Sequence, residues 1–273
     1  MPPALRRLVA VAFAVLVSAG AAGINPAPTR AADLTVDAAE AEMVRLLNAE
    51  RARHGLLKVR VDPRLMTIAR QRSADMARRD YFSHTQPDGR TVFDLIRSDR
   101  ITWFGAGEII AWNNARTLAE SAPAARDGWM RSPGHRAIVL SNSYNYFGVG
   151  LALDPVSGRR LWTGVFLKGP DLTGGWAAFG PPPTLASAAG SRYRDVTLSW
   201  TGGDVELVTL TAGPRDFQLR IRIDAGPWTT WSPGTTSRTR FLRAWRGHVY
   251  EVGVRACDRA ANCGAWVYQQ LQA

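Results

Sequence analysis

The hydrophobic periodicity of this chain changes once, at a stretch rich in glycine and proline between residues 169 and 190. Before this stretch, apolar residues recur at the three- and four-residue spacing of amphipathic helices, and after it they alternate with polar residues. Short alternating segments separated by Gly-Pro and Pro-Gly turns are typical of a small antiparallel sandwich. We therefore predict an α+β domain over residues 37–171, a Gly/Pro-rich linker over 172–189 and a β-sandwich over 190–273.

The first domain opens with two helix signals. Asp37 with Glu40 fits a variant of the capping box, and Asp62 followed by Pro63 is a typical start for the second helix. We expect the arginines of that second helix on a solvated face; they are Arg70, Arg72, Arg78 and Arg79. Apolar segments at residues 147–153 and 161–167 predict two strands, so that helices followed by a hairpin imply an α+β domain.

The first 32 residues have the features of a secretory signal peptide. Arg6 and Arg7 precede an unbroken apolar run over residues 8–17, and Thr29-Arg30-Ala31 offers a cleavage site with small residues at the first and third positions. The run is too short to span a bilayer comfortably. We expect residues 1–32 to direct export and the mature protein to be extracellular, with an uncleaved anchor as the alternative.

Cysteine content and charge agree with export. Cys257 and Cys263 are the two cysteines, and a close pair in an exported protein predicts a local disulfide. The formal net charge of +11 suits attraction to an anionic envelope. We do not expect nucleic-acid binding, because the chain has no basic block and no zinc-finger, RNA-recognition or basic-zipper signature.

Three polar side chains are the candidates for a functional site: His84, Glu108 and His135. Each lies beside small or turn-forming residues, and Gly105 and Gly107 flank the approach to Glu108. Two imidazoles and one carboxylate suit a divalent metal or acid–base chemistry. They also suit a buried hydrogen-bonded cluster with only a structural role.

The order of short motifs in the first domain resembles the CAP superfamily of SCP-like proteins, in its bacterial secreted branch. The resemblance covers about residues 40–168. It is carried by Leu47-Asn48-Ala49-Glu50-Arg51, His54-Gly55-Leu56, Asp62-Pro63-Arg64-Leu65, Phe82-Ser83-His84, Gly107-Glu108, Trp129-Met130-Arg131-Ser132-Pro133-Gly134-His135-Arg136, Phe147-Gly148-Val149-Gly150 and Trp162-Thr163. The resemblance implies a three-layer α-β-α sandwich with an open cleft.

Carried over by position, the cleft residues of the family correspond to His84, Glu108 and His135. Eukaryotic members have a second glutamate where this chain has Ser132 and a histidine where it has Leu161, so the full tetrad of two histidines and two glutamates is absent. Three polar partners common in the bacterial pattern are also replaced, by Ile109, Ile138 and Gly164. Such outer partners orient metal ligands, so their loss bears directly on metal affinity.

The second domain resembles a fibronectin type III or related immunoglobulin-like module. The resemblance rests on Leu198-Ser199-Trp200, on residues 247–256 and 258–262, and on Trp266. It implies a spacer or adhesion module. This domain also holds Trp228, Trp231, Trp245 and Trp266, for which core packing is the default and stacking on sugar rings the alternative.

Three functions follow from these features. The first is a secreted module that binds a lipid, peptide or cell-wall glycan in a His/Glu-lined cleft, with no required cofactor. The second is a metal-assisted extracellular hydrolase, with a zinc-like ion on His84, Glu108 and His135. The third is a structural polar cluster, with recognition left to the β-sandwich. A serine hydrolase is not expected, because Ser83 is merely adjacent to His84 and the chain has no G-x-S-x-G motif.

Overall fold

The computed structural model describes residues 33–188 and 190–273. The predicted signal peptide over residues 1–32 lies outside this range. Within the described residues, no helix has both the length and the apolar character needed to cross a membrane.

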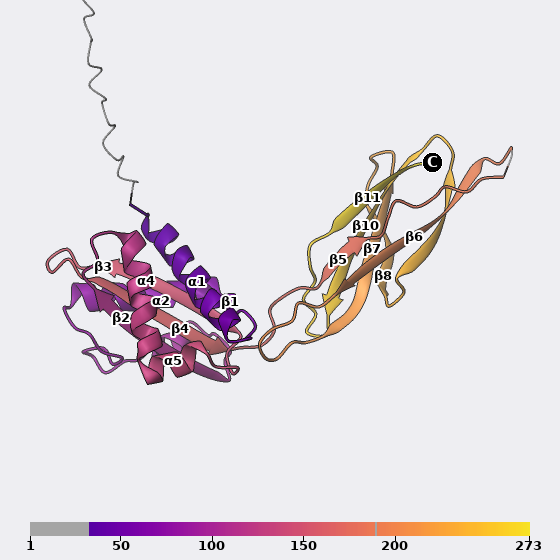
Figure 1. The fold of residues 1–273 in the computed structure, drawn as a ribbon. Helices are drawn as coiled ribbons and strands as arrows, with labels where there is room; N and C mark the ends of the chain where they lie inside the picture. The colour runs from indigo at the N-terminus through magenta and orange to yellow at the C-terminus, as the bar shows by residue number, and fades with distance from the viewer. Residues whose placement is uncertain (1–32, 189) are drawn as a thin grey trace, which may run out of the picture. The chain divides into compact units, whose positions relative to one another are not determined.

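The first domain combines helices with one four-stranded sheet (Figure 1). Its helices are α1 (Val36–Arg53), α2 (Pro63–Arg78), α3 (Val92–Ser98), α4 (Leu118–Arg131) and α5 (Pro133–Val139). Its strands are β1 (Arg60–Val61), β2 (Gly105–Asn113), β3 (Tyr146–Leu153) and β4 (Arg160–Lys168). The sheet order is β1-β3-β4-β2, with β1 parallel to β3 and the other pairs antiparallel.

The sheet has helices on both faces, and its side chains alternate between two cores. On β4, Trp162 and Phe166 join a cluster with residues of α1, α4 and α5. Val165 and Leu167, the two residues that flank Phe166 on the strand, join a second cluster with residues of α2 and α3. The α-β-α layering predicted from the sequence is therefore present.

Two glycines on β3 allow α2 to lie against the backbone of the sheet. A Cβ atom at Gly148 would overlap the backbone of Leu65, and one at Gly150 would overlap the backbone of Ala69 and Arg70. The separation between α2 and the sheet is therefore set by the absence of these side chains. That separation matters for the site, because α2 supplies its central arginine.

The prediction for the start of the first helix is wrong in detail. The N-cap of α1 is Thr35, whose hydroxyl accepts from the Ala38 N–H, so Asp37 lies inside the helix. Glu40 does not complete a capping box; it is buried, pairs with Arg70 at 2.5 Å and accepts from the backbone N–H of Leu151 at 3.0 Å. The prediction for α2 is correct, with Asp62 as N-cap and proline at the first position.

The second domain consists of strands in two antiparallel sheets, of order β11-β10-β7-β8 and β5-β6-β9 (Figure 1). The strands are β5 (Trp176–Phe179), β6 (Tyr193–Gly203), β7 (Pro214–Ile223), β8 (Thr229–Thr235), β9 (Thr239–Trp245), β10 (Val249–Asp258) and β11 (Val267–Gln272). Leu198 on β6 and Leu219 and Val252 on the other sheet belong to one buried cluster. Two antiparallel sheets sharing one core agree with a β-sandwich; the fibronectin type III assignment stays a prediction.

Two features at the edges of this domain bear on the sequence predictions. Part of the predicted linker is a strand, because residues 176–179 pair with β6, from Trp176 opposite Gly203 to Phe179 opposite Trp200. The glycine and proline residues around this segment led to its prediction as linker, although its four residues form an edge strand of a sheet. The predicted disulfide between Cys257 and Cys263 is present.

We predict that Gly148→Ala lowers the free energy of unfolding by about 3 kcal/mol, because the added methyl group would force α2 away from β3. The measurement is urea denaturation followed by circular dichroism. Gly128→Ala is the matched control: Gly128 lies within α4 with open space around its Cβ position, so this variant should be stabilised by about 0.5–1 kcal/mol. Equal stability of the two variants would contradict the close packing of α2.

Candidate functional site

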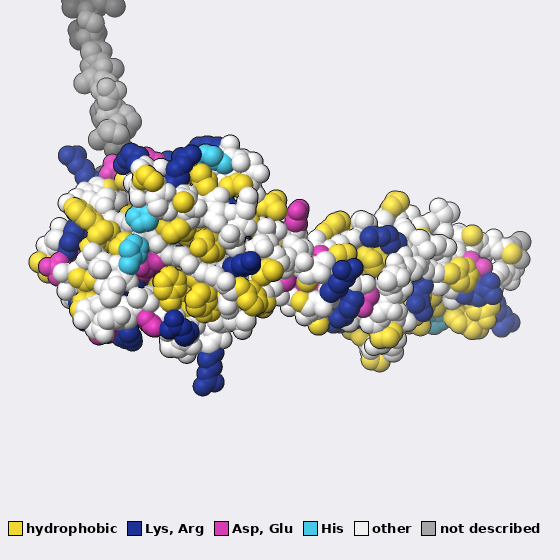
Figure 2. Space-filling model, turned by 90° about the horizontal axis from the view of Figure 1, so that it is seen from below, with side chains coloured by type: hydrophobic (Ala, Val, Ile, Leu, Met, Phe, Trp, Pro, Cys, Tyr) yellow, Lys and Arg dark blue, Asp and Glu magenta, His cyan; other side chains and the backbone are white. Residues whose placement is uncertain are grey.

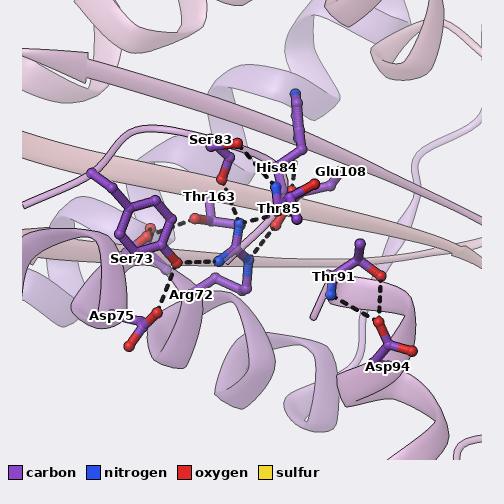
Figure 3. A network of polar contacts seen from close by, with 12 residues as sticks. Arg72, Ser73, Asp75, Ser83, His84, Thr85, Thr91, Asp94, Glu108 and Thr163 are labelled. Carbon is purple, nitrogen blue, oxygen red and sulfur yellow. Dashed lines mark hydrogen bonds and ion pairs between the residues drawn. The ribbon is translucent and has the colours of Figure 1, made fainter. Parts of the chain in front are cut away.

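A buried arginine lies at the centre of the candidate site (Figure 3). Arg72, on α2, has no exposed side-chain surface. Its Nε donates to Glu108 Oε1 at 2.8 Å, its Nη1 to the Tyr81 hydroxyl at 2.7 Å and its Nη2 to the Ser83 carbonyl at 2.8 Å. The prediction that this arginine belongs to a solvated face is therefore wrong.

The charge of Arg72 is balanced by Glu108 in a poorly solvated environment. Burial alone would lower the pKa of the guanidinium, but the hydrogen bond and the charge of Glu108 outweigh it and raise that pKa. The Tyr81 hydroxyl donates in turn to Asp75 at 2.7 Å. Burial and then this contact with Asp75 raise the pKa of Tyr81 to about 12. The phenol therefore stays protonated at physiological pH and keeps both of its hydrogen bonds.

Glu108 lies within strand β2, and its side chain is only 3% exposed. Its Oε2 contacts His84 Nδ1 at 2.7 Å, while Oε1 accepts from Arg72. Gly107 precedes Glu108 on this strand, and a Cβ there would press on the Tyr144 hydroxyl at 3.1 Å and on Ile138 at 3.3 Å. The glycine makes room for these two side chains on the opposite face of the strand.

His84 lies in the loop between α2 and α3, with 53% of its side chain exposed. The Arg72 contact with the Ser83 carbonyl holds the loop just before it, and a hydrogen bond of 2.8 Å from the Gln86 N–H to the Arg90 carbonyl closes the loop beyond it. Because a carboxylate can only accept, His84 donates its Nδ1–H to Glu108. In the neutral form of the imidazole, this leaves the Nε2 lone pair free.

His135 reaches the same place from α5. Pro133 starts this helix, and His135 lies in its first turn. Arg51 holds the other end of the helix, where its Nη1 donates to the carbonyls of Val139 and Ser141 at 2.7 and 2.8 Å. The ring centroids of His135 and His84 are 6.1 Å apart. Partial burial, and then the charge of His84, lower the pKa of His135, so its imidazole is neutral at physiological pH.

A pocket of about 330 Å³ lies beside this group. Glu108 and the exposed His84 form its polar side. Its other walls are mostly apolar: Thr91, Val92, Phe93, Ala106, Gly107, Ile138 and Tyr144. Neighbouring histidine side chains bordered by hydrophobic surface are visible in Figure 2. The structure thus brings the three predicted residues close together, with Glu108 buried and His84 exposed, beside a pocket whose mostly apolar lining the sequence did not indicate.

A metal site needs several candidate ligand atoms close to one another. In the described part of the chain, Asp171, Asp204 and Asp258 form the one group of three acidic, histidine or cysteine side chains with this property. Their candidate ligand atoms all lie within 4.8 Å of one another. His84, Glu108 and His135 do not form such a group.

The three aspartates are already satisfied by hydrogen bonds. Asp171 accepts from Thr173 and Ala212, and Asp204 accepts from the N–H groups of Val205 and Gly213. Asn262 donates to both oxygens of Asp258, once from its backbone and once from its side chain. Hydrogen bonds from N–H groups stabilise a carboxylate charge without any cation. The cluster therefore needs no metal ion to exist.

Comparison with known proteins identifies the first domain. Residues 44–166 match the model of the CAP family, described as the cysteine-rich secretory protein family. The chain is 36% identical over 139 residues to the uncharacterized protein YkwD of Bacillus subtilis (strain 168). It is 33% identical over 129 residues to the uncharacterized membrane protein YlbC of the same organism. These matches cover 51% and 47% of this chain, but only 51% and 34% of the relatives.

One solved structure is also similar to part of this chain. It is an extracellular protein containing an SCP domain from Bacillus anthracis str. Ames, with 29% sequence identity and a TM-score of 0.42. The match covers 50% of this chain and 45% of the other. The family model and the two Bacillus subtilis relatives confirm, for the first domain, the resemblance predicted from the sequence motifs.

We predict that Arg72→Met lowers the free energy of unfolding by about 3–5 kcal/mol, because it leaves the Glu108 carboxylate buried without its partner. Arg78→Met is the control, since Arg78 is exposed and pairs with Asp75 only three residues away; its change should stay within about 0.5 kcal/mol. The double variant Arg72→Met with Glu108→Gln should recover part of the loss. A double-mutant cycle from urea denaturation measures the coupling, and a value near zero would contradict the assigned pair.

Proposed function

We propose that the CAP domain formed by residues 44–166 is an exported ligand-binding module whose pocket takes an amphiphilic lipid. The single observation that carries this proposal is the composition of the pocket. Phe93, Val92 and Ile138 offer an apolar surface, and the exposed imidazole of His84 lies at one side. An acyl chain would cover the apolar wall and a carboxylate or phosphate headgroup would meet His84.

Binding without turnover agrees with how the polar groups are used. Both oxygens of Glu108 are engaged, one by Arg72 and the other by His84. A general base needs a free acceptor within reach of the proton it removes, so Glu108 serves to position His84 and not as a base itself. The Ser83 hydroxyl contacts the backbone of Thr85 and makes no hydrogen bond with His84, so it has no base to activate it. Among the expected lipid, peptide and glycan ligands, the apolar walls favour the lipid.

Export is supported by three observations. The family matched by residues 44–166 is described as secretory, and the related Bacillus anthracis protein is described as extracellular. The disulfide between Cys257 and Cys263 suits an oxidising compartment. The basic and apolar pattern of residues 1–32 supplies the targeting signal.

We predict that a fluorescent long-chain fatty acid binds the full chain. Phe93→Ala should raise its dissociation constant by about fivefold, because roughly 1 kcal/mol of apolar contact is lost. Phe104→Ala is the matched control, because Phe104 is 62% exposed and does not line the pocket. Fluorescence titration measures both variants. Equal affinities of the two variants, or no binding by the wild type, would reject the lipid proposal.

A second function, metal binding, is favoured by one contact. Glu108 takes the Nδ1–H of His84, which leaves Nε2 free beside a neutral His135. A carboxylate behind a histidine is the usual outer partner of a zinc ligand. The residues present therefore fit a zinc ion on two imidazoles, with Glu108 orienting one of them. Such an ion would supply Lewis acidity or fix an anionic headgroup.

We predict that zinc titration shifts the imidazole NMR signals of His84 and His135 together. Glu108→Gln should weaken zinc binding by about tenfold or more, because His84 loses its orienting carboxylate. His248 is an internal control: its Nδ1 also contacts a carboxylate, that of Asp224, but the structure shows no second imidazole paired with it. If zinc shifts the NMR signals of His248 as much as those of His84 and His135, the binding is non-specific and the proposal is rejected.

A further inference from the structure

The outer face of the sheet β11-β10-β7-β8 carries an ordered array of arginine and tryptophan. In the strand register, Arg220 on β7 lies opposite Gly253 on β10, which in turn lies opposite Tyr268 on β11. Arg255 lies opposite Gln218 in the same way. Their neighbours along the strands, such as Leu219 and Val254, belong to the buried core. The array therefore occupies the face of the sheet turned away from that core.

Guanidinium and indole groups follow one another along this face. The Arg220 guanidinium carbon lies 4.5 Å from the ring centroid of Trp228 and 4.3 Å from that of Trp266. Arg222 lies 4.7 Å from Trp228, and Arg255 lies 4.6 Å from Trp266. We call these five residues the arginine–tryptophan ladder. Each indole thus contacts two guanidinium groups, within the range of cation–π attraction.

The positive charge of the ladder is only partly balanced. Arg222 pairs with Glu251 at 2.5 Å. Arg255 donates to the neutral amide oxygen of Gln218, and Arg220 donates to the Tyr268 hydroxyl. Among the described residues, no carboxylate forms a salt bridge with Arg220 or Arg255, and Arg220 Nε is buried without a partner. Two of the three guanidinium groups therefore lack a counter-charge.

The electrostatic state of Arg220 agrees with this imbalance. Burial, and then the charges of Arg255 and Arg222, lower the pKa of its guanidinium. A negative group placed between these arginines would relieve the repulsion, and bonds between guanidinium and carboxylate or phosphate groups are among the stronger hydrogen bonds in proteins.

A pocket of about 400 Å³ opens on the ladder. Arg220, Arg255, Trp228 and Trp266 line it together with small hydroxyl groups and an amide: Gln218, Thr229, Thr230 and Ser232. Hydroxyl and amide groups around an aromatic and cationic centre suit a ligand that is rich in hydroxyl groups and carries negative charge.

We propose that the arginine–tryptophan ladder and its pocket bind an anionic polysaccharide. Carboxylate or phosphate groups of the glycan meet Arg220 and Arg255, and its hydroxyl groups meet Thr230 and Ser232. A single-stranded nucleic acid fits less well, because its bases need exposed aromatic faces for stacking and each indole of the ladder already contacts two guanidinium groups.

The test compares one glycan with and without its charge, using the full chain. Polygalacturonate supplies the carboxylate, fully methyl-esterified polygalacturonate removes it on the same backbone, and an oligodeoxynucleotide of matched charge represents nucleic acid. Arg255→Gln removes one ladder charge, and Arg192→Gln removes one charge from an exposed arginine outside the ladder and its pocket. Calorimetry at fixed ionic strength gives the dissociation constants.

We expect polygalacturonate to bind. Arg255→Gln should raise its dissociation constant by about tenfold, because one charge-assisted hydrogen bond is lost, whereas Arg192→Gln should change that constant less than about twofold. Arg255→Lys keeps the charge and should retain part of the affinity, which guards against a variant that fails to fold. Equal losses in both glutamine variants, unchanged binding of the esterified glycan, or equally tight oligonucleotide binding with the same dependence on Arg255 would overturn the proposal.

Discussion

The ion pair between Arg72 and Glu108 joins helix α2 to strand β2 inside the first domain. Neither side chain reaches water to any extent, so each charge depends on the other for its stability. The guanidinium also donates to Tyr81 and to the Ser83 carbonyl, and through these contacts it fixes the loop that carries His84. Removal of this one cation would therefore disturb the orientation of the exposed imidazole as well as the stability of the fold.

The backbone of the domain places these charges at the right separation. Gly148 and Gly150 let α2 lie against β3, and this close approach brings Arg72 within reach of the far strand β2. Arg51 holds α5 by its carbonyls and so places His135 near His84. The two histidines thus lie near each other because buried arginines on two different helices hold the segments that carry them.

The ordered motifs of the first domain correctly predicted its family, and Asp62-Pro63 correctly predicted the start of α2, because both are local signals. The prediction for Arg72 was wrong, since charged residues on a helix were assigned to solvent. A signal was present: position 72 continues the buried spacing of Leu65, Ile68 and Met76, whereas Arg78 falls outside it. Strand β5 was missed for a related reason, because glycine and proline around it concealed a short pairing segment.

Arg72 fixes Glu108, and Glu108 in turn fixes the tautomer of His84. The most direct measurement is ¹⁵N NMR of the His84 ring at neutral pH, in the wild type and in Arg72→Met. The structure predicts a proton on Nδ1 and a free Nε2 in the wild type, with a mixture of tautomers once the arginine is removed. A wild-type His84 protonated on Nε2, or a tautomer unaffected by the loss of Arg72, would contradict the account.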